Sequence, residues 1–161
     1  FVLLGLAGIR INKKERLDHL TWALEHMNLK AMEEKSYWSL SEGQRQRALV
    51  ARALIRRPKF LIADEPNINL DLPAAYTLME ALKNLNRNEN LTILFVTHDL
   101  TLAARYASHV ALFFDGRVEV GTRHTILTPE NLKQTFGLPI SVFEEVGGAL
   151  CVRIHRKEER P

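Results

Sequence analysis

Residues 40–71 hold two groups whose types and spacing suit nucleotide chemistry. The first is the turn at residues 40–44, which reads Leu-Ser-Glu-Gly-Gln and precedes an arginine-rich stretch that is typical of a helix. The first N–H groups of a helix have no partner within it and carry partial positive charge, so a turn with Ser41 and Gly43 can hold phosphate oxygens. Ser41 and Gln44 also fit a capping box, and this structural role is compatible with phosphate binding.

The second group is a pair of adjacent carboxylates, Asp64 and Glu65, at the end of the apolar run 60–63. The run predicts a strand buried on both faces, and Pro66 ends it. Two strand-end acids could simply cap a neighbouring helix or turn, but burying unpaired charge is costly. By analogy with phosphoryl-transfer sites, Asp64 would hold Mg²⁺ through water, and Glu65 would orient and polarise the attacking water.

A third candidate, His98, follows a second apolar, β-rich run at residues 91–96. Between the two runs, leucines recur at helical spacing over residues 72–86. A strand, a helix and a strand in this order form a right-handed crossover, so the two strands are parallel and end at the same rim of the sheet. A lone histidine at a strand end is usually structural. Because open α/β sheets bind ligands at this rim, we expect Asp64, Glu65 and His98 to meet there, with His98 contacting a γ-phosphate.

These residues together resemble the motifs of ABC-type ATPases. Residues 40–44 look like the signature motif, and residues 60–65 look like the Walker B strand with its catalytic glutamate. Residues 69–71, Asn-Leu-Asp, look like the D-loop, and His98 looks like the switch histidine. Four motifs in the family's order and approximate spacing are far more specific than any one of them.

The resemblance implies an α/β fold of the P-loop NTPase type, with a parallel sheet core, a helical subdomain and C-terminal β-hairpins. We expect the helical subdomain with the signature motif at residues 1–57. The second half of a RecA-like core, with Walker B, D-loop and switch histidine, would span residues 58–140. A C-terminal hairpin and tail would occupy residues 141–161.

Local signals predict where helices begin. Asn12 and Glu15 resemble a capping box, followed by an amphipathic helix with one apolar face, formed by Leu17, Leu20, Leu24 and Met27. We expect this face to lie in the core. Asp71 can cap the helix after it, with Pro73 in the first turn. In the resembling family this loop also crosses the dimer interface.

Local signals also predict the C-terminal elements. Asp115-Gly116 predicts a hairpin between strands at 110–114 and 117–120. Thr128-Pro129-Glu130 begins a helix that Gly137 closes. The last elements expected are a hairpin with strands at 142–146 and 149–154 around Gly147-Gly148, and a frayed tail at 156–161.

The sequence departs from the family pattern at three points. No Gly-x-x-x-x-Gly-Lys-Ser/Thr phosphate loop occurs in the 161 residues, and the family's glutamine loop is absent too. Since the chain begins at Phe1 rather than Met, we interpret it as a truncated product, the C-terminal two-thirds of a nucleotide-binding domain, which alone should bind ATP poorly and hydrolyse almost none. Glu42 stands where the family usually has glycine, and its carboxylate would repel a phosphate unless it points away.

Composition narrows the class of protein. The chain is 46% hydrophobic and 25% charged, as an ordinary globular domain is. Its formal charge of +3 is weak evidence for nucleic acid, which we do not expect as a partner. Cys151 is the only cysteine, which excludes an internal disulfide. The apolar run at residues 1–9 is too short to span a bilayer, which needs about 20 residues, so any membrane role requires a partner.

The resemblance implies an ATP-binding subunit of an ABC-type importer that uses ATP and Mg²⁺. It would sit at the cytoplasmic face of the inner or plasma membrane, bound to permease subunits. A second copy would pair head to tail, so that the turn at 40–44 closes over ATP held by the other copy. Residues 102–107 and 127–132 are most similar to importers of iron complexes, haem or cobalamin. The alternatives are an ABC-type protein without a transporter, acting on ribosomes or DNA, and a non-enzymatic regulator that lends its signature motif to a complete partner.

Overall fold

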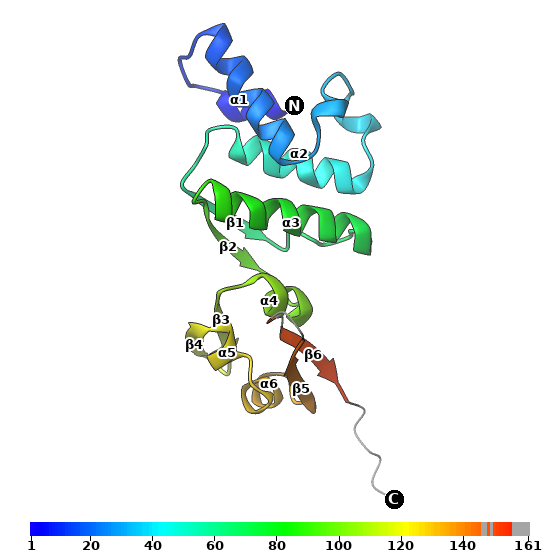
Figure 1. Cartoon of the computed structure of the whole chain (residues 1–161), viewed down its shortest axis with the longest axis vertical. Coiled ribbons are helices and arrows are strands. Elements are labelled where there is room, and N and C mark those ends of the chain that lie inside the picture. Colours follow the sequence, from blue (N-terminus) through cyan, green and yellow to red (C-terminus); the bar gives the residue numbers. More distant parts are fainter. Residues whose placement is uncertain (146–147, 149, 156–161) are drawn as a thin grey trace, which may run out of the picture. The chain divides into compact units, whose positions relative to one another are not determined.

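The computed structural model describes residues 1–145, 148 and 150–155. The chain folds as two compact units, Phe1–Val96 and Thr97–Pro161, each of which is described by itself (Figure 1). The division into segments 1–57, 58–140 and 141–161 rests on motifs rather than on compact units, and it stays a prediction. None of the helices in the described part of the chain combines the length and the apolar character that a membrane crossing requires.

The first unit combines helices with a parallel pair of strands. In chain order its elements are η1 (Val2–Leu6), α1 (Lys13–His26), η2 (Lys30–Met32), η3 (Tyr37–Ser39), α2 (Glu42–Leu54), β1 (Phe60–Asp64), α3 (Leu72–Asn88) and β2 (Thr92–Val96). The three elements that frame the predicted site, β1, α3 and β2, confirm the expected order of strand, helix and strand. Leu78, Leu82 and Leu85 of α3 are buried, as their helical spacing predicts.

The two strands of the first unit are parallel and end together. Asp64, the last residue of β1, pairs with Val96, the last residue of β2. The N–H of Glu65 extends this ladder by donating to the Val96 carbonyl at 3.0 Å. The shared rim predicted from the sequence is therefore confirmed for β1 and β2.

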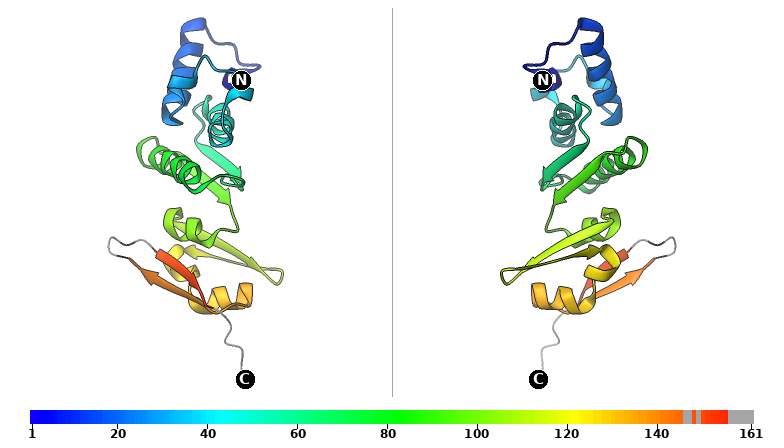
Figure 2. Two further views of the ribbon diagram at one scale, coloured as in Figure 1. Left: turned by 90° about the vertical axis from the view of Figure 1, so that its right-hand side faces the viewer. Right: turned by 90° about the vertical axis from the view of Figure 1, so that its left-hand side faces the viewer.

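The prediction that β1 is buried on both faces is wrong. Leu61 is buried, but Phe60 and Ile62 are 51% and 65% exposed. Successive side chains of a strand point to opposite faces, so β1 has one buried and one exposed apolar face. β2 repeats the pattern, because Leu94 and Val96 are also exposed. The cause is that α3 lies along one face of this pair only, as the side views show (Figure 2).

Helix α1 begins at the predicted capping box but packs over less of its length than predicted. Asn12 accepts the N–H of Glu15 at 2.9 Å, and the Glu15 carboxylate accepts the N–H of Asn12 at 3.0 Å. Leu24 and Met27 are buried, whereas Leu17 is 57% exposed, so its placement in the core was wrong. The apolar face of α1 is therefore buried towards its C-terminal end and largely exposed at Leu17.

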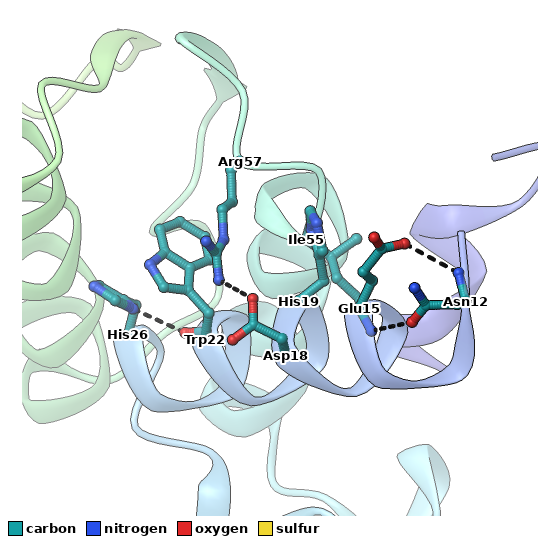
Figure 3. Close-up of polar contacts among 8 residues, drawn as sticks. All are labelled: Asn12, Glu15, Asp18, His19, Trp22, His26, Ile55 and Arg57. Carbon is teal, nitrogen blue, oxygen red and sulfur yellow. Dashed lines mark hydrogen bonds and ion pairs between the residues drawn. The ribbon is translucent and has the colours of Figure 1, made fainter. Parts of the chain in front are cut away.

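Side chains of α1 hold the chain just after α2 (Figure 3). The guanidinium of Arg57 donates to the Asp18 carboxylate at 2.7 Å and lies over the Trp22 ring, 5.3 Å from its centroid. His19 forms a hydrogen bond through Nδ1 with the Ile55 carbonyl. Arg57 has φ +50°, a left-handed conformation in which the chain leaves α2. This network therefore fixes the exit of α2 against α1.

The second unit consists of short helices and two hairpins. Its elements are α4 (Leu100–Tyr106), β3 (His109–Phe114), β4 (Arg117–Thr122), α5 (Arg123–Ile126), α6 (Pro129–Phe136), β5 (Ile140–Glu144) and β6 (Leu150–Ile154). One apolar core joins them, formed by Ala104, Leu112, Ile126, Leu127, Leu132, Ile140 and Leu150. Both hairpins are antiparallel.

The turn signals of the second unit are confirmed where the structure describes them. Asp115 and Gly116, between β3 and β4, have φ values of +46° and +71°, as a two-residue hairpin turn requires. Gly137 closes α6 in the left-handed conformation at φ +67°. The expected extension of the last hairpin through 146, 147 and 149, and the expected tail 156–161, lie outside the described residues.

Candidate functional site

The serine turn caps a well-formed helix. Ser41 is the N-cap of α2, and its hydroxyl accepts the N–H of Gln44 at 3.4 Å. The Gln44 side chain accepts the N–H of Ser41 at 3.0 Å, which completes the predicted capping box. Ser41 is exposed, so the positive end of α2 is open to a ligand from outside the chain.

Glycine at position 43 is required by the neighbouring helix. A Cβ built on Gly43 would lie 2.6 Å from the Cβ of Ala74 in the first turn of α3. Real Cβ atoms do not approach each other this closely, so α2 and α3 can meet here only because Gly43 lacks a side chain. The contact fixes the serine turn against the start of α3.

The unusual carboxylate in the turn has a cationic neighbour. Glu42 lies 3.6 Å from the guanidinium of Arg45, one turn further along α2. Arg45 also donates to the Trp38 carbonyl at 2.9 Å, which ties the segment before the turn to the helix. Arg45 thus offsets part of the negative charge that Glu42 brings to the serine turn.

The candidate catalytic glutamate occupies a strained backbone position. Glu65 follows β1 directly, is half-buried and has φ +46°, which is rare for a residue with a side chain. Its carbonyl accepts the N–H of Ile68 at 3.0 Å, and the Pro66 side chain behind it is fully buried. Such strain costs about 1–3 kcal/mol, persists only where the surroundings hold it, and clusters at functional sites. Asp64, just before Glu65, is exposed at the rim.

The loop from Glu65 to α3 ends in a cap, as predicted. Asp71 accepts the N–H of Ala74 at 2.8 Å and is the N-cap of α3, with Pro73 in the first turn. Asn69 has φ +60°, so the loop contains a second left-handed residue. Since Ala74 also contacts Gly43, the candidate D-loop and the serine turn share one packing contact.

Sequence reasoning missed one polar contact of this site. The side-chain amide of Gln46 in α2 donates to the Pro66 carbonyl at 3.0 Å. A glutamine on a polar helix carries no local signal for such a contact, because its partner is 20 residues away. Nearby, burial lowers the pKa of the Arg47 guanidinium. Within the described residues, Arg47 Nε and Asn67 Oδ1 are buried without a hydrogen-bond partner in the structure.

His98 belongs to the second unit. It is exposed and stands between Thr97 and Asp99, where the Thr97 hydroxyl accepts the N–H of Asp99 at 3.0 Å. Asp99 in turn caps α4 by accepting the N–H groups of Thr101 and Leu102. The meeting of His98 with Glu65 stays a prediction, as do the chemical roles of all the site residues.

The candidate metal ligand at the rim is the exposed carboxylate of Asp64. Across the described ranges, no three His, Cys, Asp or Glu side chains are grouped closely enough to hold a metal ion. Mg²⁺ at phosphate sites commonly uses one or two carboxylates, water and phosphate oxygens. The exposed carboxylate of Asp64 could provide the one protein ligand of such a site, with water and phosphate oxygens as the others. A site made of protein ligands alone would need more carboxylates.

Comparisons with known proteins agree with the motifs. A sequence profile described as ABC transporter matches residues 6–67, which include the serine turn and the two carboxylates. The petrobactin import ATP-binding protein FpuC of Bacillus anthracis is 34% identical over 136 residues, 84% of this chain and 50% of the relative. The chain belongs to the family of ABC transporter ATP-binding domains. In this family it also matches the iron(3+)-hydroxamate import protein FhuC of Bacillus subtilis, at 36% identity over 83% of this chain and 49% of that protein.

Other ABC relatives are named for the import of other solutes. A phosphonates import protein of a Nostoc strain is 41% identical, and a zinc uptake protein of Listeria monocytogenes is 38% identical. The chain spans about half the length of the curated relatives that it matches.

Solved structures confirm the mixed α/β ABC ATPase fold. A transporter described as of the metal-chelate ABC type, in an inward-facing conformation, matches with a TM-score of 0.85 and 28% identity over 98% of this chain and 65% of that one. The ATP-binding cassette MJ0796, in a dimeric state bound to ADP and Pi, matches with a TM-score of 0.60 and 30% identity over 74% of this chain and 52% of that one. The expected combination of a parallel strand pair, helices and C-terminal hairpins is therefore correct.

Proposed function

We propose that the chain forms the signature and Walker B portion of an ATP-binding subunit in an ABC importer. One observation carries the proposal. The serine turn, the rim carboxylates and the candidate D-loop belong to one compact unit, in which Gly43 packs against Ala74 and Gln46 holds the Pro66 carbonyl. A capped helix N-terminus and a strand-end acid pair are two of the parts that phosphoryl-transfer sites use.

In the proposed reaction Glu65 orients and polarises the attacking water, and His98 donates to the γ-phosphate. Asp64 would hold Mg²⁺ through water, and the metal would neutralise charge that develops on the phosphate oxygens. The turn from Ser41 to Gln44 would bind the γ-phosphate with its hydroxyl and backbone N–H groups. Since Ser41 is exposed, a nucleotide held by another copy can reach it.

The proposed partners are a second copy of the chain, paired head to tail, and the permease subunits of a transporter. The dimeric state of the cassette MJ0796 and the transporter that matches with a TM-score of 0.85 support both partners by similarity. Such a subunit would work as a peripheral protein at the cytoplasmic face of the inner or plasma membrane.

For the transported solute we propose an iron complex of the siderophore type. The names of the Bacillus relatives favour iron-siderophore import, and the metal-chelate type of the matching transporter agrees with them. The phosphonate and zinc relatives have similar identity, so the identity values themselves do not separate these solutes. The choice of solute in such a transporter would lie with its membrane subunits.

The proposal can be tested by combining the chain with a segment of a relative that supplies the phosphate loop. The 161 residues contain no such motif, and the apolar face with Phe60 and Ile62 is open to a further layer. We would co-express the chain with the segment of Bacillus subtilis FhuC that it does not match, and purify the two-piece ATPase. Mg²⁺-dependent ATP hydrolysis is expected from the two pieces together and from neither piece alone. Substantial hydrolysis by the chain alone would contradict the proposal.

A second candidate is a non-enzymatic regulator, for which the exposed turn at Ser41 would be sufficient. Such a chain would lend its serine turn to a complete ATPase without hydrolysing ATP on its own carboxylates. Mixing it with intact FhuC separates the two candidates, because a regulator changes the rate of FhuC and Ser41→Ala cancels the change. A Glu65→Gln variant would leave this effect of a regulator intact.

A further inference from the structure

The side chain of Gln46 in helix α2 contacts the loop that follows Glu65. Gln46 lies in the second turn of α2, five residues after Ser41, and its amide donates to the Pro66 carbonyl at 3.0 Å. The bond is partly buried, and the Pro66 side chain is fully buried. A hydrogen bond in such surroundings is less exposed to competition from water than one at the surface.

The position of this carbonyl gives the contact its importance. Pro66 follows Glu65 directly, and Glu65 holds a left-handed backbone at φ +46°. On the other side, the N–H of Glu65 is held by the Val96 carbonyl of β2. The strained residue is therefore anchored from β2 at its own N–H and from α2 at the next carbonyl. Strained conformations of this kind persist only where the surrounding structure holds them.

We infer that Gln46 is a positioning residue that sets the backbone, and hence the carboxylate direction, of Glu65. The inference rests on the proposed function, in which Glu65 polarises the attacking water. Gln46 touches no reacting atom and acts only through the Pro66 carbonyl. Ser41 begins the same helix, and Gly43 packs that helix against Ala74, so Gln46 projects from an element that is held in place.

The first test uses the 161-residue chain. Gln46→Met keeps an unbranched side chain of similar length and good helix propensity but removes the donor. We expect the Ile68 amide, which donates to the Glu65 carbonyl, to exchange its hydrogen about five- to tenfold faster. The backbone carbon chemical shifts of Glu65, which report its φ, should move. The backbone amides of Leu82 and Leu85, in the middle of α3, should keep their hydrogen-exchange rates.

The matched control is Gln134→Met, an exposed glutamine of α6 in the second unit, which should leave the Ile68 amide unchanged. An unchanged Ile68 rate in Gln46→Met would overturn the inference. Equal acceleration at Ile68, Leu82 and Leu85 would overturn it too, because it would mean that Gln46 only supports the stability of the unit.

The second test uses the two-piece ATPase. Gln46→Met should lower kcat by about tenfold or more while KM for ATP stays within about twofold, because misplacing a catalytic group affects the chemical step more than binding. An unchanged kcat would count against the role of Gln46. If the unmodified two pieces hydrolyse no ATP, the proposed function fails, whereas the exchange rates still decide whether Gln46 sets the Glu65 backbone.

Discussion

Gly43 of α2 lies against Ala74 of α3 so closely that an added Cβ would be 2.6 Å from the Ala74 Cβ. Two motifs that are 30 residues apart in sequence, the serine turn and the Asp71 cap, thereby share one contact. A glycine in a phosphate-binding turn is commonly explained by the approach of the ligand. Here the neighbouring helix already excludes a side chain.

We expect Gly43→Ala to destabilise the chain by about 1–3 kcal/mol, the usual effect of overpacking a close contact. Ala74→Gly in the same chain should recover part of this loss, although glycine alone costs about 1 kcal/mol within a helix. Urea unfolding of the two single variants and the double variant measures the coupling. Strictly additive effects would show that the two residues do not press on each other.

Glu65→Gln should lower kcat of the two-piece ATPase by about 100-fold or more while ATP binding is retained, because the amide cannot polarise water as the carboxylate does. Turnover with labelled ATP, together with nucleotide binding measured by fluorescence, separates the two effects. Glu34→Gln is the control, since Glu34 is exposed and lies outside the motifs. Equal activity of the Glu65 and Glu34 variants would remove Glu65 from the reaction.

Asp71→Ala should lower the free energy of unfolding by about 0.5–2 kcal/mol, because the N–H of Ala74 loses its acceptor at the start of α3. Asp71→Ser keeps a capping oxygen and should restore most of the stability. Denaturant midpoints of both variants check this order. If Asp71→Ser also lowers hydrolysis by the two-piece ATPase without lowering stability, the carboxylate has a role besides capping.

The thiol of Cys151 should react slowly near pH 8. Its pKa is raised, mainly by a hydrogen bond with the Glu145 side chain and then by burial, with Arg105 acting in the opposite direction. A raised pKa means less thiolate at a given pH, and the thiolate is the reactive form. Glu145→Ala should shift the pH profile of iodoacetamide alkylation to lower pH. Glu144→Ala is the matched control, and an equal shift in both variants would exclude a specific effect of Glu145.

Asp18→Asn should cost less than about 1 kcal/mol, since its ion pair with Arg57 is exposed and surface pairs contribute little. Arg57 keeps its place over the Trp22 ring in this variant. The small loss should disappear at about 1 M salt, where the screening length falls to about 3 Å. Unfolding curves at low and high salt measure the difference, and a larger loss that persists in salt would point to a structural role of Asp18.

Local chemistry made much of the fold predictable. Asn12, Ser41, Asp71 and Thr128 each cap the helix that was expected after them, because capping depends on a few neighbouring residues. The hairpin turn at Asp115 followed in the same way. The end of β1 at the two carboxylates was also correct to within one residue.

Contacts between distant residues were not predictable. The apolar run of β1 suggested burial on both faces, yet a residue's polarity does not reveal which layer covers it, and Ile62 is exposed. Leu17 fits the apolar face of α1 but is 57% exposed. The contacts Gln46–Pro66 and Gly43–Ala74 depend on how α2 packs, and no spacing rule specifies that packing.

The open apolar face of β1 and β2, with Phe60, Ile62, Leu94 and Val96, has a consequence for the protein inside a cell. Surface of this kind is what chaperones and proteases bind. A chain whose face stays open in this way is therefore a substrate for both, and any layer that covers the four side chains would protect it.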